Sequence, residues 1–410
     1  MRVRRGLRPA TAVKTSIVTP GFLAVLGAGT AIAALACAAL RRGSLARRVM
    51  AITAGLLALG SGAAGVNAYF AYIPTVGALV GRRAADQASA RQVARAIRAP
   101  SLPSHGLVER VSIPGIVSGF HARPAQVYLP PAWFASPRPA LPVVELLHGT
   151  PGTPEDWTRA AQADLIADRW AATHGGYAPL LVMPDVNGSF TGDTECADGP
   201  RGNAETYLTV DVPRWAQTVL GATSDRRGWA LVGASEGGYC ALTLALRHPD
   251  RYGAFADFSG LDHPTAHGGA LRVFGGSRRL LLEHTPAWLL RHRTRPPLAG
   301  WFEVGGADGS VTRAVRRAAR DAALHGIVTE VRILPHARHT WRVWHRAFAD
   351  ALPWLVARLS AADAPAPRPP REGLRCEPRH CPRAPARARQ RSTTRVRRPR
   401  RPDHVTGSPA

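Results

Sequence analysis

The stretch Trp229–Ala241 reads W-A-L-V-G-A-S-E-G-G-Y-C-A and contains the pattern G-x-S-x-G at Gly233–Gly237. A short apolar run precedes the pattern, and a segment of helical character, Tyr239–Arg247, follows it. Strand, pattern and helix in this order predict a nucleophile elbow, a sharp turn that lifts Ser235 Oγ clear of a sheet. Glycines are expected there because side chains beside so tight a turn would collide. The alternative is a glycine-rich turn without catalysis, because the pattern also occurs by chance.

The composition indicates a folded chain with unevenly distributed charge. The 410 residues are 45% hydrophobic, which is enough for a sizeable core, and the net charge is +25. Much of that charge lies in Met1–Lys14, in Arg41–Arg48 and in residues 361–410, where thirteen Arg face four acids. The charge therefore belongs to the ends and a loop, and nucleic-acid binding by the folded part is not expected.

Two uncharged segments near the N-terminus, Pro20–Leu40 and Val49–Tyr72, are each long enough to cross a membrane as a helix. They predict a two-helix transmembrane anchor. The alternative is a cleaved signal peptide, with a small-residue site at Ala36-Cys37-Ala38, followed by a single anchor.

The basic segments disagree about membrane orientation. A cytoplasmic Arg41–Arg48 loop places everything after Tyr72 outside the cytoplasm, whereas the arm Met1–Lys14, with Arg82 and Arg83, favours the reverse. A plain count of Lys and Arg favours the inside, so the outside placement depends on the family resemblance described below. A translation start near Val13 would remove the conflict.

Changes in composition divide the chain into five parts. The last part, residues 361–410, is rich in Ala, Pro and Arg and has almost no large apolar residue, which predicts disorder and supports no specific partner. The parts are a basic arm (1–19), the anchor (20–72), a polar stalk (73–105), a catalytic domain (106–360) and the tail (361–410).

From Leu107 onwards, short β-rich runs alternate with helical segments, which predicts an α/β domain with a largely parallel sheet and helices on both faces. Eight strands are expected, near Leu107–Ile113, Ala125–Leu129, Val143–Leu147, Leu180–Met183, Trp229–Val232, Ala254–Phe258, Trp301–Val304 and Glu330–Leu334. Helices are expected near Asp156–Ala172, Val212–Leu220, Gly237–Arg247, Val311–His325 and Trp344–Leu359.

A serine nucleophile needs a base and a carboxylate that orients the base, in the chain order Ser, Asp/Glu, His for α/β-hydrolases. Asp308 follows the seventh strand on a Gly-rich loop, and His339 follows the eighth, so we predict the triad Ser235, Asp308 and His339. The weaker candidates are His336 for the base, and Asp257, Asp262 and Glu303 for the acid.

Acyl transfer also needs hydrogen-bond donors for the developing oxyanion. The run L-L-H-G-T-P-G-T-P-E-D-W follows the third strand, and a backbone N–H there can face the elbow. We predict the backbone amides of Thr150 and Glu236 as the two donors, and a structural role for His148.

These motifs, together with H-P-D-R-Y-G-A-F-A-D-F-S-G and H-T-W-R-V-W, resemble the esterase family of α/β-hydrolases that contains esterase D-like enzymes and the antigen 85 mycolyltransferases. The resemblance covers roughly Gly106–Leu359 and is greatest to the membrane-anchored actinobacterial branch, which implies an extracytoplasmic esterase domain on the cell membrane. It also implies the triad and the oxyanion donors named above. Relatives often have Met where this chain has Glu236, so a carboxylate beside the nucleophile is expected to alter substrate preference.

Cysteine use fits an oxidising compartment. Cys196 and Cys240 both come from the side of the sheet where the site is built, and we predict a disulfide between them, with two buried free thiols as the alternative. No cofactor is expected, and no metal site, because Cys376, Cys381 and the neighbouring His380 form no recognisable zinc pattern.

Three functions follow from these patterns. The first is a serine esterase that hydrolyses a small-molecule, lipid or glycolipid ester through an acyl-enzyme. The second passes the acyl group to a sugar hydroxyl, and the third is a non-catalytic binding module on the same fold.

Overall fold

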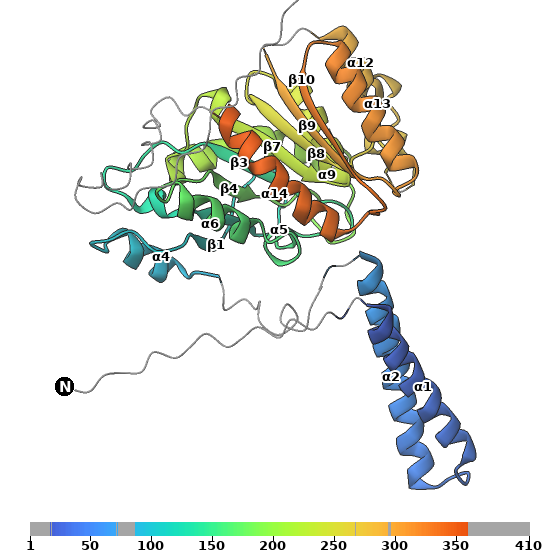
Figure 1. Ribbon diagram of the computed structural model, residues 1–410. Helices are drawn as coiled ribbons and strands as arrows, with labels where there is room; N and C mark the ends of the chain where they lie inside the picture. Colours follow the sequence, from blue (N-terminus) through green and yellow to red (C-terminus); the bar gives the residue numbers. More distant parts are fainter. Residues whose placement is uncertain are drawn as a thin grey trace, which may run out of the picture. The chain divides into compact units, whose positions relative to one another are not determined.

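The computed structural model describes residues 17, 19–70, 72, 87–266, 268–293 and 297–359 (Figure 1). The predicted tail (361–410), nearly all of the basic arm and residues 73–86 of the predicted stalk lie outside these ranges. Within the stalk, α4 (Ala90–Ile97) begins with a capping box in which Ser89 and Gln92 satisfy each other's backbone N–H groups.

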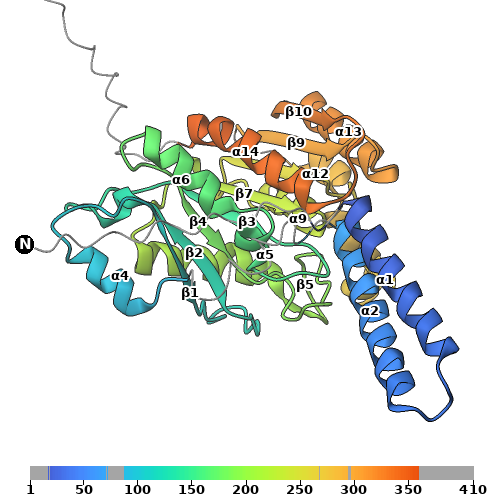
Figure 2. The same ribbon diagram turned by 60° about the horizontal axis from the view of Figure 1, so that its bottom comes forward.

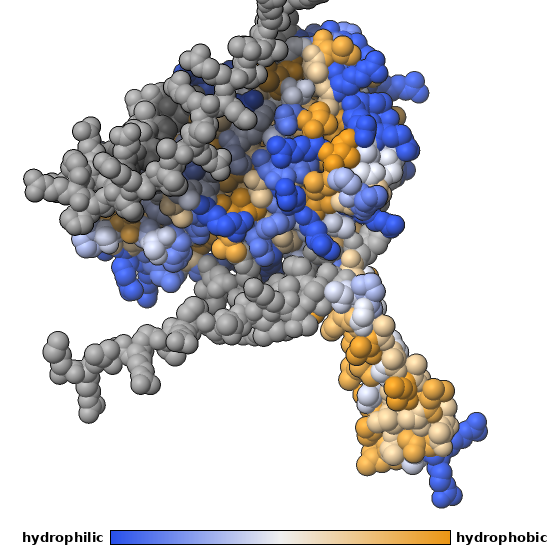
Figure 3. All heavy atoms as spheres, viewed as in Figure 1, coloured by the Kyte–Doolittle hydropathy of each residue, from blue (hydrophilic) through white to orange (hydrophobic). Residues whose placement is uncertain are grey.

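The two apolar segments form a helical hairpin, α1 (Pro20–Ala39) and α2 (Leu45–Phe70). Both helices are long and apolar enough to cross a membrane, and Figure 3 shows apolar residues over most of their surface. Thr30 Oγ1 and Ser61 Oγ lie 3.2 Å apart across the hairpin, so one hydroxyl satisfies the other between two apolar helices. The membrane orientation stays a prediction.

An eight-stranded sheet forms the centre of the domain that follows, which confirms the predicted fold class. The strand order is β1-β2-β4-β3-β7-β8-β9-β10, and β2 pairs antiparallel with both β1 and β4 while the other pairs are parallel. The strands are β1 (Leu107–Val111), β2 (Ala125–Leu129), β3 (Val143–Leu147), β4 (Leu180–Met183), β7 (Trp229–Ala234), β8 (Ala254–Phe258), β9 (Ala299–Gly305) and β10 (Val328–Leu334). The short strands β5 (Asp198–Gly199) and β6 (Gly202–Asn203) pair separately.

Helices cover both faces of the sheet (Figures 1 and 2). The helices α6 (Ala163–Thr173) and α14 (Trp341–Arg358) pack on one face, and α9 (Glu236–Arg247), α12 (Pro286–His292) and α13 (Ser310–Leu324) pack on the other. The shorter elements are α5 (Asp156–Arg159), α7 (Ala204–Thr206), α8 (Val212–Trp215), α10 (Ala270–Val273), α11 (Arg278–Glu283), the 3₁₀ turns η2 (Pro131–Phe134) and η5 (Arg226–Gly228), and the π-helical turns η3 (Tyr207–Asp211) and η4 (Ala216–Leu220).

Two predicted helices differ from the structure. The expected helix Asp156–Ala172 is divided into α5 and α6, because Gln162 adopts a left-handed conformation (φ 53°) that a continuous right-handed helix cannot contain. The expected helix Val212–Leu220 belongs to a longer helical run, α7 to η4, that includes two π-helical turns.

The sheet register places the loops of the site beside one another. β3 pairs with β7 from Val143 opposite Trp229 to Leu147 opposite Gly233. The loop after β3 and the turn after β7 therefore leave the sheet at the same edge, which is where open α/β sheets bind ligands.

Candidate active site

The turn after β7 has the backbone strain expected of a nucleophile elbow. Ser235 has a positive φ of 59° and a ψ of −122°. A Cβ on Gly233 would lie 1.8 Å from the carbonyl oxygen of Gly237, and a Cβ on Gly237 would lie 2.1 Å from that of Leu147. Both glycines are therefore required by close approach of backbone, and the turn leaves Ser235 partly exposed at the edge of the sheet.

The structure brings the three predicted triad residues together in line. His339 Nε2 lies 2.9 Å from Ser235 Oγ, and His339 Nδ1 lies 2.8 Å from Asp308 Oδ2. Asp308 lies between β9 and α13, and His339 lies between β10 and α14. The His339 ring meets Trp344 edge to face, with 4.9 Å between ring centroids, so the first turn of α14 packs against the imidazole.

The weaker candidates of the sequence have other partners. His336 is exposed. Asp257 is buried and accepts a hydrogen bond from the Gly260 N–H (2.6 Å), and burial raises its pKa to about 7. Asp262 pairs with His263 and Arg317, and Glu303 accepts a hydrogen bond from Trp301 Nε1 at 3.0 Å.

The loop after β3 comes close to the elbow. A Cβ on Gly149 would lie 2.9 Å from the Ala234 carbonyl oxygen and 3.0 Å from Ser235 Cβ, so only glycine allows this approach. Thr150 follows Gly149 and Glu236 follows Ser235, so the backbone amides of these two predicted oxyanion donors lie next to this contact. The structure therefore places both near the nucleophile.

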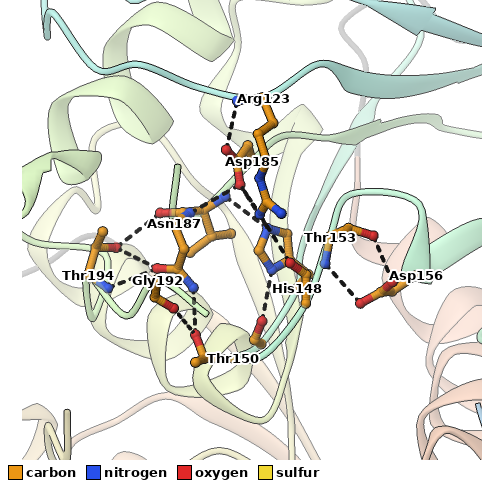
Figure 4. Close-up of polar contacts among 12 residues, drawn as sticks. Arg123, His148, Thr150, Thr153, Asp156, Asp185, Asn187, Gly192 and Thr194 are labelled. Atoms are coloured by element: carbon orange, nitrogen blue, oxygen red, sulfur yellow. Dashed lines mark hydrogen bonds and ion pairs between the residues drawn. The ribbon is translucent and has the colours of Figure 1, made fainter. Parts of the chain in front are cut away.

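A buried polar network holds the loop from below, and sequence reasoning did not detect it (Figure 4). His148 is fully buried and lies 3.2 Å from Asp185 Oδ1, and its Nδ1 lies 2.9 Å from the carbonyl oxygen of Gly149. Arg123 forms a 2.5 Å ion pair with Asp185. Burial opposes ionisation of Asp185, but hydrogen bonds from His148 and Arg123 outweigh it and hold its pKa below the usual range.

A second network joins Glu236 to this loop and to the loop after β4 (Figure 4 shows its Thr150, Asn187 and Gly192 members). Glu236 Oε2 contacts Thr150 Oγ1 and accepts a 2.8 Å hydrogen bond from Asn187 Nδ2. Thr150 Oγ1 also lies 2.6 Å from the carbonyl oxygen of Gly192, which can only accept. A hydroxyl has one proton, so when Thr150 donates to Gly192, the proton between Thr150 and Glu236 must come from Glu236.

The electrostatics agree with a protonated Glu236. Burial and the neighbouring carboxylates of Asp193 and Glu195 raise its pKa to about 8, although hydrogen bonds from Thr150 and Asn187 act in the opposite direction. Near neutral pH, Glu236 is therefore mainly a neutral acid one residue from the nucleophile.

Cys196 and Cys240 form a disulfide, with a Cα–Cα distance of 5.7 Å, which confirms the prediction. The alternative of two free thiols is wrong. The bridge ties the loop after β4 to the second turn of α9. It thereby positions Asp193 and Glu195, which precede Cys196, against the elbow.

A cavity of about 180 Å³ lies at Ser235 and His339. Four of its lining residues, Thr150, Ser235, Glu236 and His339, were predicted as site residues from the sequence, and the others were missed, although the acidic run D-T-E-C was a usable signal. Within the described ranges, no group of three potential metal-ligating side chains occurs. The lining residues are Thr150, Asp193, Glu195, Ser235, Glu236, Tyr239, Ser259, Leu261, His263, Thr265, Val311 and His339.

Comparisons with known proteins agree with this architecture. Residues 121–355 match the family model described as "Putative esterase". An uncharacterized protein from Corynebacterium glutamicum is 31% identical over 348 residues, which cover 81% of each chain. The MPT51 antigen of Mycobacterium leprae is 38% identical over 110 residues, 25% of this chain and 36% of the antigen.

Among solved structures, an S-formylglutathione hydrolase from Agrobacterium tumefaciens has the same fold, with a TM-score of 0.54 and 20% identity. The match covers 64% of this chain and 99% of that one. The family model covers more than half of the chain and contains all three residues of the predicted triad. The chain therefore belongs to the esterase family of α/β-hydrolases.

Proposed function

We propose that this protein is a membrane-anchored serine esterase that hydrolyses carboxylic esters through the triad Ser235, His339 and Asp308. One observation carries the proposal, namely the unbroken line from Ser235 Oγ to His339 Nε2 (2.9 Å) and from His339 Nδ1 to Asp308 Oδ2 (2.8 Å). These distances are within hydrogen-bond reach, so base and orienting acid are in place before substrate arrives.

In the proposed reaction, His339 Nε2 accepts the proton of Ser235 as Oγ attacks the ester carbonyl carbon. The negative charge that develops on the carbonyl oxygen is held by the backbone N–H groups of Thr150 and Glu236. His339 then donates its proton to the departing alcohol, which leaves an acyl group on Ser235. A water molecule, deprotonated by His339, attacks this acyl-enzyme and releases the acid.

The membrane anchor is the hairpin of α1 and α2, and we propose that the esterase domain lies outside the cytoplasm. The Cys196–Cys240 disulfide supports this placement, because disulfides persist in oxidising compartments. A reporter fused after Gly81 tests it: activity of an extracytoplasmic reporter is expected, and a cytoplasmic signal would contradict the orientation.

The catalytic proposal is tested with the purified protein and p-nitrophenyl esters of short and long acyl chains. We expect hydrolysis by the wild type and a loss of at least about 10³-fold in kcat for Ser235→Ala. Ser104→Ala, at an exposed serine, is the matched control and should retain activity. A folded wild type that cleaves no acyl ester would contradict the proposal.

Acyl transfer remains the second candidate, supported by the local similarity to the MPT51 antigen and by the family resemblance to mycolyltransferases. Adding trehalose to the same assay separates the two reactions. A free acid as the only product supports hydrolysis, and an acylated sugar supports transfer.

A further inference from the structure

The two edges of the sheet differ in how they are covered within the described part of the chain. At the first edge, Glu109 of β1 forms a bridge with Ala88, whose N–H donates to the Val108 carbonyl oxygen at 2.7 Å. The other edge strand, β10, lies at the opposite end of the sheet (Figure 1), and within the described ranges it pairs with β9 alone. One row of backbone donors and acceptors on β10 therefore faces outward.

The hydrogen bonds to β9 show which residues of β10 form this outward row. The Val328 N–H donates to the Leu298 carbonyl oxygen at 3.3 Å, and the Leu334 carbonyl oxygen accepts from the Gly306 N–H at 2.7 Å. Alternate residues of a strand direct their backbone groups to the same neighbour, so the even-numbered residues of β10 bond to β9. The outward-facing residues are the odd-numbered ones, Thr329, Val331 and Ile333.

The strand β10 lacks several features by which proteins keep sheet edges from associating. Such edges are often short or bulged, or they carry Pro or Lys. β10 has seven residues, pairs with β9 in one continuous register, and contains neither Pro nor Lys. Val328 and Val331 are 61% and 44% exposed, and Leu324, in the helix that leads into the strand, is 70% exposed. This edge is therefore suited to pairing with another strand.

The sequence of β10, V-T-E-V-R-I-L, is complementary to itself when two copies run antiparallel about Val331. Val331 then lies opposite Val331 of the second copy, and Glu330 lies opposite Arg332 on both sides of the twofold axis. Opposite charges, and apolar or β-branched side chains, stabilise antiparallel strands when they face each other directly. The remaining facing pairs are Thr329 with Ile333 and Val328 with Leu334.

The charges also select this register over its neighbours. Backbone hydrogen bonds form only when outward-facing residues of one copy meet outward-facing residues of the other, which the register about Val331 satisfies. A shift that keeps this condition centres the pair on Glu330 or on Arg332. The first would place two copies of Glu330 opposite each other, and the second would do the same with Arg332. Like charges directly opposite are destabilising, so the register about Val331 is favoured.

Glu330 and Arg332 already have contacts within the chain, and the pairing does not require these to break. Arg332 Nε lies 3.6 Å from Glu330 Oε1, Arg332 Nη1 lies 3.6 Å from Asp350 Oδ2, and the guanidinium lies over the Trp301 ring at 4.6 Å. The Glu330 and Arg332 side chains remain 43% and 45% exposed, so a second copy can reach them. Across the axis the four charges would alternate in sign, which gives each one an opposite charge both along and across the strands.

We propose that this protein forms a twofold-symmetric dimer in which β10 of two copies pairs antiparallel about Val331 and joins the two eight-stranded sheets into one. The partner is a second copy of this chain because the edge is complementary to itself in backbone bonding, charge and apolar surface. Both copies contribute the same strand, as a twofold interface requires. The inference does not rest on the proposed esterase function, since no residue of the proposed triad belongs to β10.

Cysteine cross-linking of the full chain in detergent micelles tests the register. Val331→Cys should form a covalent dimer on mild oxidation, because hydrogen-bonded antiparallel partners have Cα atoms about 5.5 Å apart, within the reach of a disulfide. Thr329→Cys is the matched control: its two copies would lie about 14 Å apart along the strands, so at least tenfold less covalent dimer is expected. The background for both variants carries Ser at the three cysteines outside the disulfide, Cys37, Cys376 and Cys381.

Charge reversal tests the complementarity by sedimentation of the full chain in detergent. Glu330→Lys and Arg332→Glu each place like charges opposite one another twice, so each should raise the dimer dissociation constant at least tenfold. A mixture of the two variants should associate as tightly as wild type, because every facing pair then has opposite charges. Glu109→Lys, on the other edge strand, is the matched control and should leave the dissociation constant unchanged.

The outcomes decide the inference without an activity measurement. A wild type that stays monomeric at the concentrations of the cross-linking experiment would overturn it. So would equal cross-linking of Val331→Cys and Thr329→Cys, which would indicate random collision. A dimer that is insensitive to Glu330→Lys and does not cross-link through Val331→Cys would place the contact elsewhere, for example on the hairpin of α1 and α2, and would overturn it too. If Arg332→Glu does not fold, the two cysteine variants decide the question by themselves.

Discussion

A carboxylic acid lies at each end of helix α9, and the two acids differ in their surroundings: Glu236 is the first residue of the helix, and Glu205 comes from α7 and lies beside its last turn. At the first residue, Glu236 contacts the hydroxyl of Thr150 and the amide of Asn187, and burial and neighbouring acids raise its pKa to about 8. Beside the last turn, Glu205 lies 2.6 Å from Arg247 Nε and also contacts the imidazoles of His248 and His284. The same helix therefore begins beside a neutral acid and ends beside an ionised one.

Glu205 is a buried carboxylate with a structural role, and its charge is paired with nitrogen groups of the protein. His248 and His284 also reach it, at 2.6 and 2.9 Å. Burial opposes its ionisation, but hydrogen bonds from His248 and His284 and the charge of Arg247 outweigh burial and hold its pKa below the usual range. Cations at a helix C-terminus are also favoured by the helix dipole.

Glu236 departs from that pattern although the dipole favours a negative charge at a helix N-terminus. We interpret the difference as a division between function and stability. The elbow end keeps a neutral acid where the proposed oxyanion forms, and the opposite end uses a paired acid to join α7, α9 and the segment before α12.

The largest expected effect lies at the elbow end. Asp308→Asn should lower kcat for p-nitrophenyl acetate by about 10³–10⁴-fold, because the amide no longer holds His339 in the required tautomer. Asp257→Asn, at the buried acid on the neighbouring strand, is the matched control and should cost far less. If Asp257→Asn proved the more damaging in folded protein, the assignment of the triad acid would be wrong.

Removing the acid at the opposite end should affect stability instead. Glu205→Ala leaves the buried His284 and the partly buried Arg247 and His248 without their carboxylate, and we expect the free energy of unfolding to fall by about 3–5 kcal/mol. Glu236→Gln should lower it by only about 1 kcal/mol, because the amide keeps the size and can still donate to Thr150. The hydrogen bond that Asn187 donates to Oε2 is lost, but Asn187 Nδ2 also donates to Thr150 Oγ1. Denaturant unfolding measures both, and similar losses for the two variants would remove the contrast.

The Cys196–Cys240 disulfide is attached to the same helix, because Cys240 lies in the second turn of α9. Its ends are 44 residues apart in sequence, so the double variant Cys196→Ala/Cys240→Ala should lose about 2–4 kcal/mol of unfolding free energy. Reducing the disulfide of the wild type should lower the unfolding free energy by the same amount as the double substitution. A negligible change would show that the loop after β4 is held by its hydrogen bonds alone.

The smallest expected effect is the pH dependence of the neutral acid. As the pH rises through about 8, Glu236 ionises and places a negative charge beside the proposed oxyanion donors, so kcat for a neutral ester should fall several-fold. Glu236→Gln has no such proton and should retain its kcat up to pH 9.5. An identical alkaline decline in the variant would show that another group titrates.

The pKa shifts of Glu236 and Glu205 make the free energy of unfolding depend on pH in opposite directions. The folded pKa of Glu236 is above the ordinary value of about 4.3, so its contribution is fully present below that value and is lost as the pH rises through about 8. The folded pKa of Glu205 is lowered, so its contribution is present above about 4.3 and is lost as the pH falls. The two ends of α9 therefore lose their stabilisation in opposite directions of pH.

The sequence by itself determined the order of strands and helices and the positions of Ser235, Asp308 and His339. These features have local signals: alternation of apolar runs, glycines at Gly233 and Gly237, and loops that directly follow strands. A local signal survives in sequence because neighbouring residues must satisfy backbone geometry whatever the rest of the chain does.

Only the tertiary structure decided which distant polar groups meet. Nothing near Glu236 in sequence indicates Thr150 or Asn187 as its partners, and nothing near Glu205 indicates His284. The ionisation of each acid depends on burial and on charges brought together across tens of residues, which no short pattern records. The sequence therefore predicted the proposed catalytic groups, whereas the packing of the loops around α9 determined which polar partners each acid has and whether that acid is ionised.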